Sequence, residues 1–262
     1  MGKKITLQGI LFDEKSSYLK GPALAPPLIR EAYHSESANY FSEDGTKISP
    51  ALFDDTGDYE IKEYWDIERI TSKNLKSDQP LLTLGGDHSI TYPILRAIHA
   101  MHGPIDMLHI DAHADLYDNF EGDRYSHACP FARIMEEQLA SRLVQVGIRT
   151  LSDHQKVQAA KFGVEIIPMR DLDLTRLPNF ENPLYLSLDV DALDPAFAPG
   201  VSHHEPGGLT TRQLLHIIQQ IKAPLIAADI VEYNPSRDIN HMTAMVSAKL
   251  LKEIVAKMMK GL

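Results

Sequence analysis

The chain has 262 residues, of which 44% are hydrophobic and 24% are charged, and its formal net charge is −10 at pH 7. This acidic balance argues against a nucleic-acid partner, because binding to phosphates requires basic patches. With Cys129 as its one cysteine the chain cannot form an internal disulfide, and no apolar run approaches the roughly 20 residues of a membrane span. We therefore expect a cytoplasmic protein, folded as a single domain over residues 1–262, that binds neither nucleic acid nor membrane.

The first 76 residues predict few regular elements. Residues 4–11 alternate weakly and indicate a strand, and Pro27 suits the first turn of a helix that continues through Tyr33. Residues 35–60 are polar and rich in turn formers, which predicts surface loops with a short strand near Ala51-Leu52-Phe53. A helix is expected over about 61–76.

From residue 80 onward, apolar runs alternate with segments of helical periodicity. Strands are expected at 80–84, 105–110, 142–147, 164–167, 184–189 and 224–231, and helices at 91–102, 130–140, 152–162, 210–221 and 241–260. Such alternation predicts a mostly parallel sheet that is covered by helices on both faces. In these sheets ligands bind beyond the carboxyl ends of the strands.

Acidic clusters follow three of the expected strands directly, at 85–89 (GGDHS), 111–115 (DAHAD) and 189–191 (DVD). Strand side chains repeat every two residues, so Asp111, His113 and Asp115 can face one spot, and so can Asp189 and Asp191. A single aspartate usually caps a helix or makes a turn. Converging carboxylates repel one another, however, and oxygen-rich ligands with a few imidazoles suit Mn²⁺ or a similar divalent ion. The ligand count fits two ions roughly 3.5–4 Å apart.

These clusters, with DVDALDP at 189–195 and DIVEYNP at 229–235, closely resemble the signatures of the ureohydrolase family, which includes arginases, agmatinases, guanidinobutyrases and formimidoylglutamases. The resemblance covers nearly the whole chain and is closest in pattern to agmatinase. It implies an α/β fold of three layers, α/β/α, with an eight-stranded, mainly parallel sheet. It also implies two manganese ions per subunit and a homotrimer or homohexamer.

The resemblance further implies a role for each ligand. One manganese ion would be held by His88, Asp111, Asp115 and Asp189, and the other by Asp111, His113, Asp189 and Asp191. Asp111 and Asp189 would therefore bridge the two ions. A hydroxide would attack the guanidinium carbon, and Asp115 would carry the proton that the leaving amine needs.

Two further residues resemble the family's substrate-handling groups. Glu232 corresponds to a glutamate that holds the substrate guanidinium, which a carboxylate can pair with two hydrogen bonds. His127 corresponds to a proton-shuttling or substrate-contacting histidine, although a lone loop histidine is more often solvated. Asp229 is expected to support the site or to cap a strand end. His203 and His204 either edge the substrate pocket or are exposed.

The choice of substrate depends on the loop at 116–126. This loop lacks the Ser-Gly-Asn and His-Gly elements of arginases and offers Asp118, Glu121 and Asp123 instead. Acidic side chains at the mouth would attract a cationic tail, although Arg124 opposes this effect. The sequence therefore predicts hydrolysis of agmatine to putrescine and urea. The alternatives are a guanidinobutyrase, arginase or formimidoylglutamase, a deacetylase-like enzyme with one zinc ion, and a non-catalytic metal-binding relative.

Overall fold

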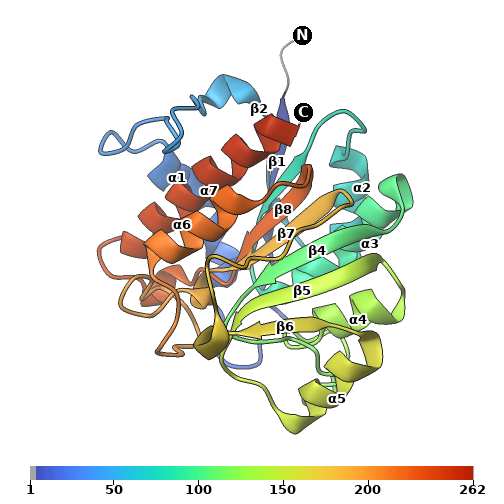
Figure 1. Cartoon of the computed structure of the whole chain (residues 1–262). Helices are drawn as coiled ribbons and strands as arrows, with labels where there is room; N and C mark the ends of the chain where they lie inside the picture. Colours follow the sequence, from blue (N-terminus) through green and yellow to red (C-terminus); the bar gives the residue numbers. More distant parts are fainter. Residues whose placement is uncertain (1–3, 262) are drawn as a thin grey trace.

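A computed structural model of the protein describes residues 4–261. Its centre is one eight-stranded sheet with the strand order β2-β1-β3-β8-β7-β4-β5-β6 (Figure 1). All neighbouring strands run parallel. The strands are β1 (Ile5–Leu11), β2 (Phe53–Glu60), β3 (Leu81–Leu84), β4 (Ile105–Ile110), β5 (Ala140–Ile148), β6 (Glu165–Pro168), β7 (Leu184–Asp189) and β8 (Leu225–Val231). The expected α/β fold with an eight-stranded sheet is confirmed, and the sheet is parallel throughout.

Helices cover both faces of the sheet, which gives three layers (Figure 1). One face carries α1 (Ala25–Tyr33), α6 (Thr211–Gln220) and α7 (Met242–Gly261), and the other carries α2 (Asp66–Asn74), α3 (Thr91–His102), α4 (Pro130–Glu136) and α5 (Asp153–Phe162). Alternate residues of a strand enter opposite cores. In β7, Leu186 packs in the core on the α7 side and Tyr185 in the core on the α3 side.

Local sequence signals set several helix ends. Ser152 and Gln155 form a capping box at the start of α5, and Thr210 and Gln213 form another at the start of α6. Prolines occupy the first turns of α1 and α4, where a missing N–H costs nothing. These signals explain why most predicted helices lie within a few residues of the observed ones.

The largest difference from the sequence prediction is β2. The prediction placed surface loops over 35–60 with a short strand near 51–53, but residues 53–60 form a full strand that pairs with β1. β2 lies at the edge of the sheet and carries Asp54, Asp55 and Asp58. Charged residues are common on edge strands because they hinder pairing with other chains. The polar composition therefore indicated an edge and not a loop.

Smaller differences concern element boundaries. The helix predicted at 61–76 covers only Asp66–Asn74, and the helix predicted at 130–140 ends at Glu136. Gln138 adopts a φ of 54° in the turn that follows, and β5 begins at Ala140, earlier than predicted. Helices often end where the next residue adopts a left-handed conformation, and this residue is usually glycine. Because Gln138 takes that position here, the sequence contained no signal for the end of the helix.

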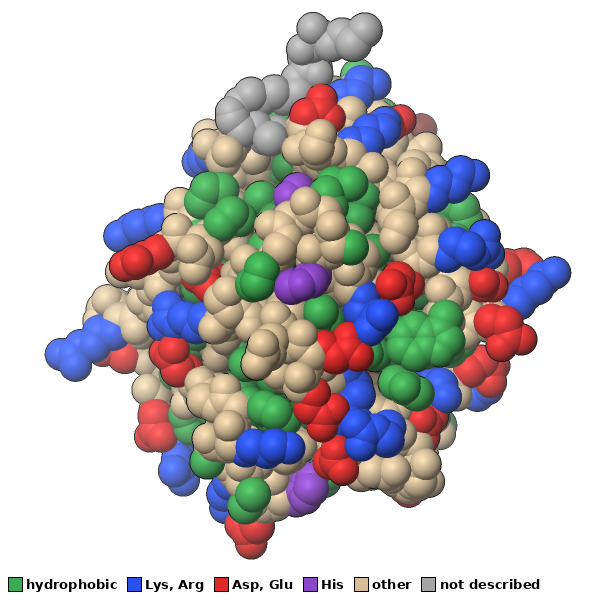
Figure 2. All heavy atoms as spheres, turned by 90° about the vertical axis from the view of Figure 1, so that its right-hand side faces the viewer, with side chains coloured by type: hydrophobic (Ala, Val, Ile, Leu, Met, Phe, Trp, Pro, Cys, Tyr) green, Lys and Arg blue, Asp and Glu red, His purple; other side chains and the backbone are tan. Residues whose placement is uncertain are grey.

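Within residues 4–261, no helix is both long enough and apolar enough to cross a membrane. The face that carries α2 to α5 mixes Lys and Arg with Asp and Glu (Figure 2), and Arg96 there pairs with Glu68 and Glu137. Among the described residues on this face, no continuous basic surface is visible. The carboxyl ends of the four central strands, β3, β8, β7 and β4, all lie on the same side of the sheet. The acidic clusters lie at these strand ends.

Candidate metal centre

The imidazole of His88 is the centre of the first group of side chains. Its Nδ1 lies 3.2 Å from Oδ2 of Asp111, 3.2 Å from Oδ2 of Asp115 and 3.1 Å from Oδ2 of Asp189. These residues lie at or just after the carboxyl ends of β3, β4 and β7, and all four are buried. Asp87 caps the turn that carries His88 by accepting the Ser89 N–H at 3.0 Å. The sheet thus brings together donors that are up to 101 positions apart in the chain.

The other nitrogen of His88 is oriented by Ser187. Nε2 lies 2.9 Å from Oγ of Ser187, and that hydroxyl donates to Oδ1 of Asp229 at 2.8 Å. Because the hydroxyl proton is used on Asp229, Oγ accepts Nε2–H, and Nδ1 is the nitrogen that faces the three carboxylates. Asp229 also accepts from Tyr185 and Thr91 at 2.6 and 2.7 Å. It lies inside β8, so it supports the site and does not cap the strand.

A second group forms around His113. Its Nδ1 lies 3.1 Å from Oδ2 of Asp191 and 3.4 Å from Oδ1 of Asp111. Asp111 therefore presents Oδ2 to His88 and Oδ1 to His113. One carboxylate that faces both groups is the arrangement that a bridging ligand requires.

The donor set fits divalent cations. Two ligand atoms at about 2.1 Å from a common ion, at right angles, lie about 3 Å apart, close to the spacings around His88 and His113. Burial lowers the pKa of each histidine, but the carboxylates outweigh it and raise both well above the usual value. Burial and nearby carboxylates raise the pKa of Asp189 strongly and that of Asp191 to about 6. The cluster thus lacks positive charge, which cations supply.

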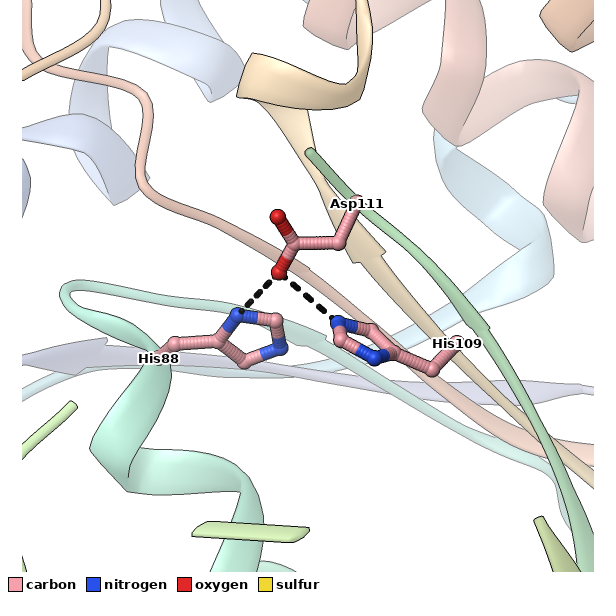
Figure 3. Close-up of side chains that lie close together, drawn as sticks. All are labelled: His88, His109 and Asp111. Carbon is pink, nitrogen blue, oxygen red and sulfur yellow. Dashed lines mark hydrogen bonds and ion pairs between the residues drawn. The ribbon is translucent and has the colours of Figure 1, made fainter. Parts of the chain in front are cut away.

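His109 lies beside this centre and was not among the predicted site residues. Its Nε2 lies 2.8 Å from Oδ2 of Asp111 (Figure 3). Gln145 uses Nε2 to donate to the carbonyl of Ala114 at 2.6 Å and to Nδ1 of His109 at 3.0 Å. Nδ1 of His109 is therefore an acceptor, and Nε2 carries the proton that Asp111 accepts. With its Nε2 proton directed at Asp111, His109 orients that carboxylate and is not itself a ligand. The sequence signal that could have identified His109 as a site residue was its position two residues before Asp111.

The predicted substrate residues lie at the same edge. Oε1 of Glu232 accepts the backbone N–H of His88 at 2.9 Å and lies 3.0 Å from Nδ1 of His127. Asp115 and Glu232 both adopt left-handed φ angles, 47° and 63°. Such angles cost free energy in non-glycine residues and cluster at functional sites. The backbone is bent at both points so that the carboxylates face inward.

Two influences act in opposite directions on His127. Burial lowers its pKa, but the hydrogen bond and charge of Glu232, with the charges of Asp115 and Asp87, raise the pKa to about 9. The backbone N–H of Ser17, however, lies 3.2 Å from Nε2 and needs a lone pair there. This contact favours the neutral imidazole with its proton on Nδ1, directed at Glu232.

These side chains open into a cavity of about 450 Å³. The lining combines the carboxylates and histidines with neutral groups: Ser17, His113, Asp115, Tyr117, Phe120, His127, Ala128, Thr150, Leu151, Ser152, Gln155, Asp189, Asp191, His203 and Glu232. His203 belongs to this lining, whereas His204 is exposed and lies 2.8 Å from the carbonyl of Pro199. The two histidines that the sequence could not separate therefore have different surroundings.

Cys129 is buried, and burial raises its thiol pKa to about 12.

Two of the three acidic side chains of the loop at 116–126 form ion pairs with basic groups. Asp118 pairs with Arg124 at 3.1 Å and with Arg133 at 2.9 Å, and Asp123 pairs with Lys15 at 2.6 Å. Of the three acids in the loop, neither Asp118 nor Asp123 is left to attract a cationic tail. These two side chains therefore do not provide the attraction for a cationic tail that the sequence predicted.

A parallel α/β sheet whose strand ends gather histidines and shared carboxylates defines a class of metal-dependent hydrolase. The arginase family profile matches residues 3–256. The chain is 46% identical to "Arginase 1, mitochondrial" of Arabidopsis thaliana (97% of this chain, 81% of that relative) and 33% identical to "Agmatinase, mitochondrial" of Gallus gallus (94% and 78%). Its fold superposes on "Arginase from Medicago truncatula" with a TM-score of 0.92 and 42% identity (98% and 87%).

The chain belongs to the arginase family and is a ureohydrolase. The family expected from the sequence is confirmed. The greater likeness to agmatinases is not, because the arginase of Arabidopsis thaliana is more similar than the agmatinase of Gallus gallus. The names of both relatives place them in mitochondria, so the cytoplasmic location expected for this chain stays a prediction.

Proposed function

We propose that the protein is a dinuclear manganese hydrolase that converts L-arginine to ornithine and urea. One observation carries the proposal: Asp111 faces His88 with one oxygen and His113 with the other, beside a cavity whose lining includes His113 and Glu232. The 46% identity to an arginase, over 97% of this chain, supports arginine as the substrate.

The six predicted ligands would hold two cations in the two groups already described. The ligands are His88, Asp111, His113, Asp115, Asp189 and Asp191. Manganese suits a donor set with four carboxylates and two imidazoles. When bound, such a pair lowers the pKa of water and so supplies a nucleophile near neutral pH.

The remaining chemistry belongs to side chains of this chain. Burial raises the pKa of Glu232, but the hydrogen bond and charge of His127, together with the backbone N–H and charge of His88, outweigh burial and lower it. The carboxylate of Glu232 would orient the guanidinium group. Asp115, whose Oδ2 faces His88, would pass a proton to the departing amine. His127 would exchange protons with the site through its contact with Glu232.

Agmatine is the second candidate substrate. Among the described residues that line the cavity, none is Lys or Arg. An α-carboxylate would therefore meet no lysine or arginine there and would depend on donors such as Ser17, Ser152 and Gln155, whereas agmatine has no carboxylate to place. The lack of a basic side chain among these lining residues therefore favours agmatine as the second candidate.

The decisive experiment is urea release by the Mn²⁺-loaded protein from arginine, agmatine, guanidinobutyrate and guanidinopropionate, with ammonia measured from formimidoylglutamate. The proposal requires the highest kcat/KM for arginine. A preference for agmatine would support the second candidate, and turnover of formimidoylglutamate alone would reject both. Absence of turnover with every substrate would favour a non-catalytic relative.

Three organisational features are also proposed. We infer a homotrimer or homohexamer, to be tested by light scattering on the purified protein. We infer one domain over 1–262, to be tested by limited proteolysis, although residues 1–3 and 262 lie outside the described residues. We infer a cytoplasmic location from the single, buried Cys129, to be tested by cell fractionation.

A further inference from the structure

A serine that no sequence signal singled out lies against His127. Nε2 of His127 lies 2.8 Å from Oγ of Ser17, while Nδ1 lies 3.0 Å from Oε1 of Glu232. Ser17 is exposed at the mouth of the cavity, and the other two residues are buried. The three side chains therefore form a hydrogen-bonded row that leads from the floor of the cavity to solvent.

The segment that carries Ser17 is fastened on both sides. The buried carboxylate of Asp87 accepts the N–H of Lys15 at 3.0 Å and the hydroxyl of Ser16 at 3.3 Å. The carbonyl of Lys15 in turn accepts the N–H of His127 at 3.2 Å. These contacts fix the backbone immediately before Ser17 to the site. The placement of its hydroxyl is therefore set by the fold and not by a freely moving loop.

The proposed reaction requires protons to move at this position. A guanidinium ion and water give urea and an alkylammonium ion, so both protons of the water end on the departing nitrogen. Asp115 can transfer one of them. The second must travel by another group or be exchanged with solvent.

We propose that Ser17 is the outer end of a proton relay that connects His127 with solvent. A hydroxyl can donate and accept at once. Oγ gives its proton to Nε2 as it takes one from solvent water, and Nδ1 releases its own proton toward Glu232 and the amine. The reacting water gives one proton to Asp115 and the other to solvent, so one proton enters and one leaves in each turnover. This role rests on the proposed hydrolase function, since it serves the same cavity.

A matched pair of variants isolates the hydroxyl. Ser17→Thr keeps it, whereas Ser17→Val replaces it with a methyl group of the same shape and hinders water from taking its place. Both variants are loaded with Mn²⁺, checked for metal content, and assayed for urea release at saturating arginine or agmatine. We expect kcat of Ser17→Val to be about ten-fold or more below that of Ser17→Thr, with KM changed less than about two-fold.

Buffer rescue separates a relay from a structural effect. Imidazole at increasing concentration should restore kcat of Ser17→Val and leave Ser17→Thr unchanged, because a small base can replace the missing hydroxyl. Equal kcat in the two variants would overturn the proposal, as would a loss that buffer does not restore. A rise in KM alone would make Ser17 a substrate contact instead. If the unmodified protein releases no urea from any guanidine, the hydrolase function itself fails and the relay with it.

Discussion

The hydroxyl of Ser187 lies between Nε2 of His88 and Oδ1 of Asp229, at 2.9 and 2.8 Å. This position fixes which nitrogen of His88 faces the carboxylates, because Oγ can accept only from an Nε2 that carries the proton. Residues that orient a metal ligand in this way typically contribute about 10- to 100-fold to metal affinity.

Replacing Ser187 with Ala should therefore weaken metal binding by about 10- to 100-fold without removing a ligand. The variant leaves Nε2–H without its acceptor and lets the ring adopt the other tautomer. Metal titration of the apoprotein measures the effect, and Ser72→Ala, on the exposed side of α2, is the control. Unchanged affinity would show that Ser187 does not orient His88.

Asp111→Asn should abolish urea release and lower the bound metal below two ions per chain. The amide keeps the shape of the side chain but removes the charge that faces both His88 and His113. Elemental analysis after dialysis measures the metal content. The control is Asp153→Asn, on the surface of α5. Full turnover by Asp111→Asn would contradict a shared ligand.

Glu232→Gln should lower kcat/KM by about 100-fold or more, because it removes an ionised partner of the guanidinium group. Metal content should stay unchanged, since the nearest contacts of Glu232 are the His88 backbone and His127. Glu121→Gln, in the exposed part of the acidic loop, is the matched control and should leave kcat/KM and metal content unchanged. An effect confined to metal content would assign Glu232 to the metal centre instead.

Metal removal should destabilise the protein more at pH 8 than at pH 5. Without cations, burial and neighbouring carboxylates raise the pKa of Asp191 from 3.8 to about 6, and carboxylates raise that of His88 above 6.5 despite burial. Both groups bind more protons folded than unfolded, so the free energy of unfolding falls as pH rises through these ranges. Bound cations take the place of the protons and remove this dependence.

Urea unfolding midpoints, with EDTA or with Mn²⁺, measure this dependence. The difference between the two midpoints should widen steadily from pH 5 to pH 8. A difference that stays constant would mean that the cluster does not exchange protons for cations.

The sequence predicted the sheet, its helices and the converging clusters because these depend on local patterns. Apolar runs at strand spacing located β3, β4, β7 and β8, and the residues that follow each strand gather at the carboxyl edge by geometry alone. The polar strand β2 could not be found in this way, because an edge strand needs no continuous apolar run.

Side-chain contacts that the loops make with other parts of the chain could not be predicted either. Whether Asp118 attracts a substrate or pairs with Arg133 depends on a contact between a loop and α4 that no periodicity reveals. The same holds for Ser17 and His127, which are 110 positions apart. The inward direction of His203 and the outward direction of His204 depend on the course of one loop.

The donor groups of the candidate centre come from the ends of β3, β4 and β7, with Glu232 following β8, and these four strands meet only after most of the chain has been made. A growing polypeptide on the ribosome, or an amino-terminal fragment that ends between β4 and β7, would lack Asp189, Asp191 and Glu232. Under the proposed function, such a chain would hold neither both cations nor the carboxylate proposed to bind the guanidinium group. Because the proposed ligands come from strands that are far apart in the sequence, an unfinished or truncated chain would not be able to hydrolyse the proposed substrate.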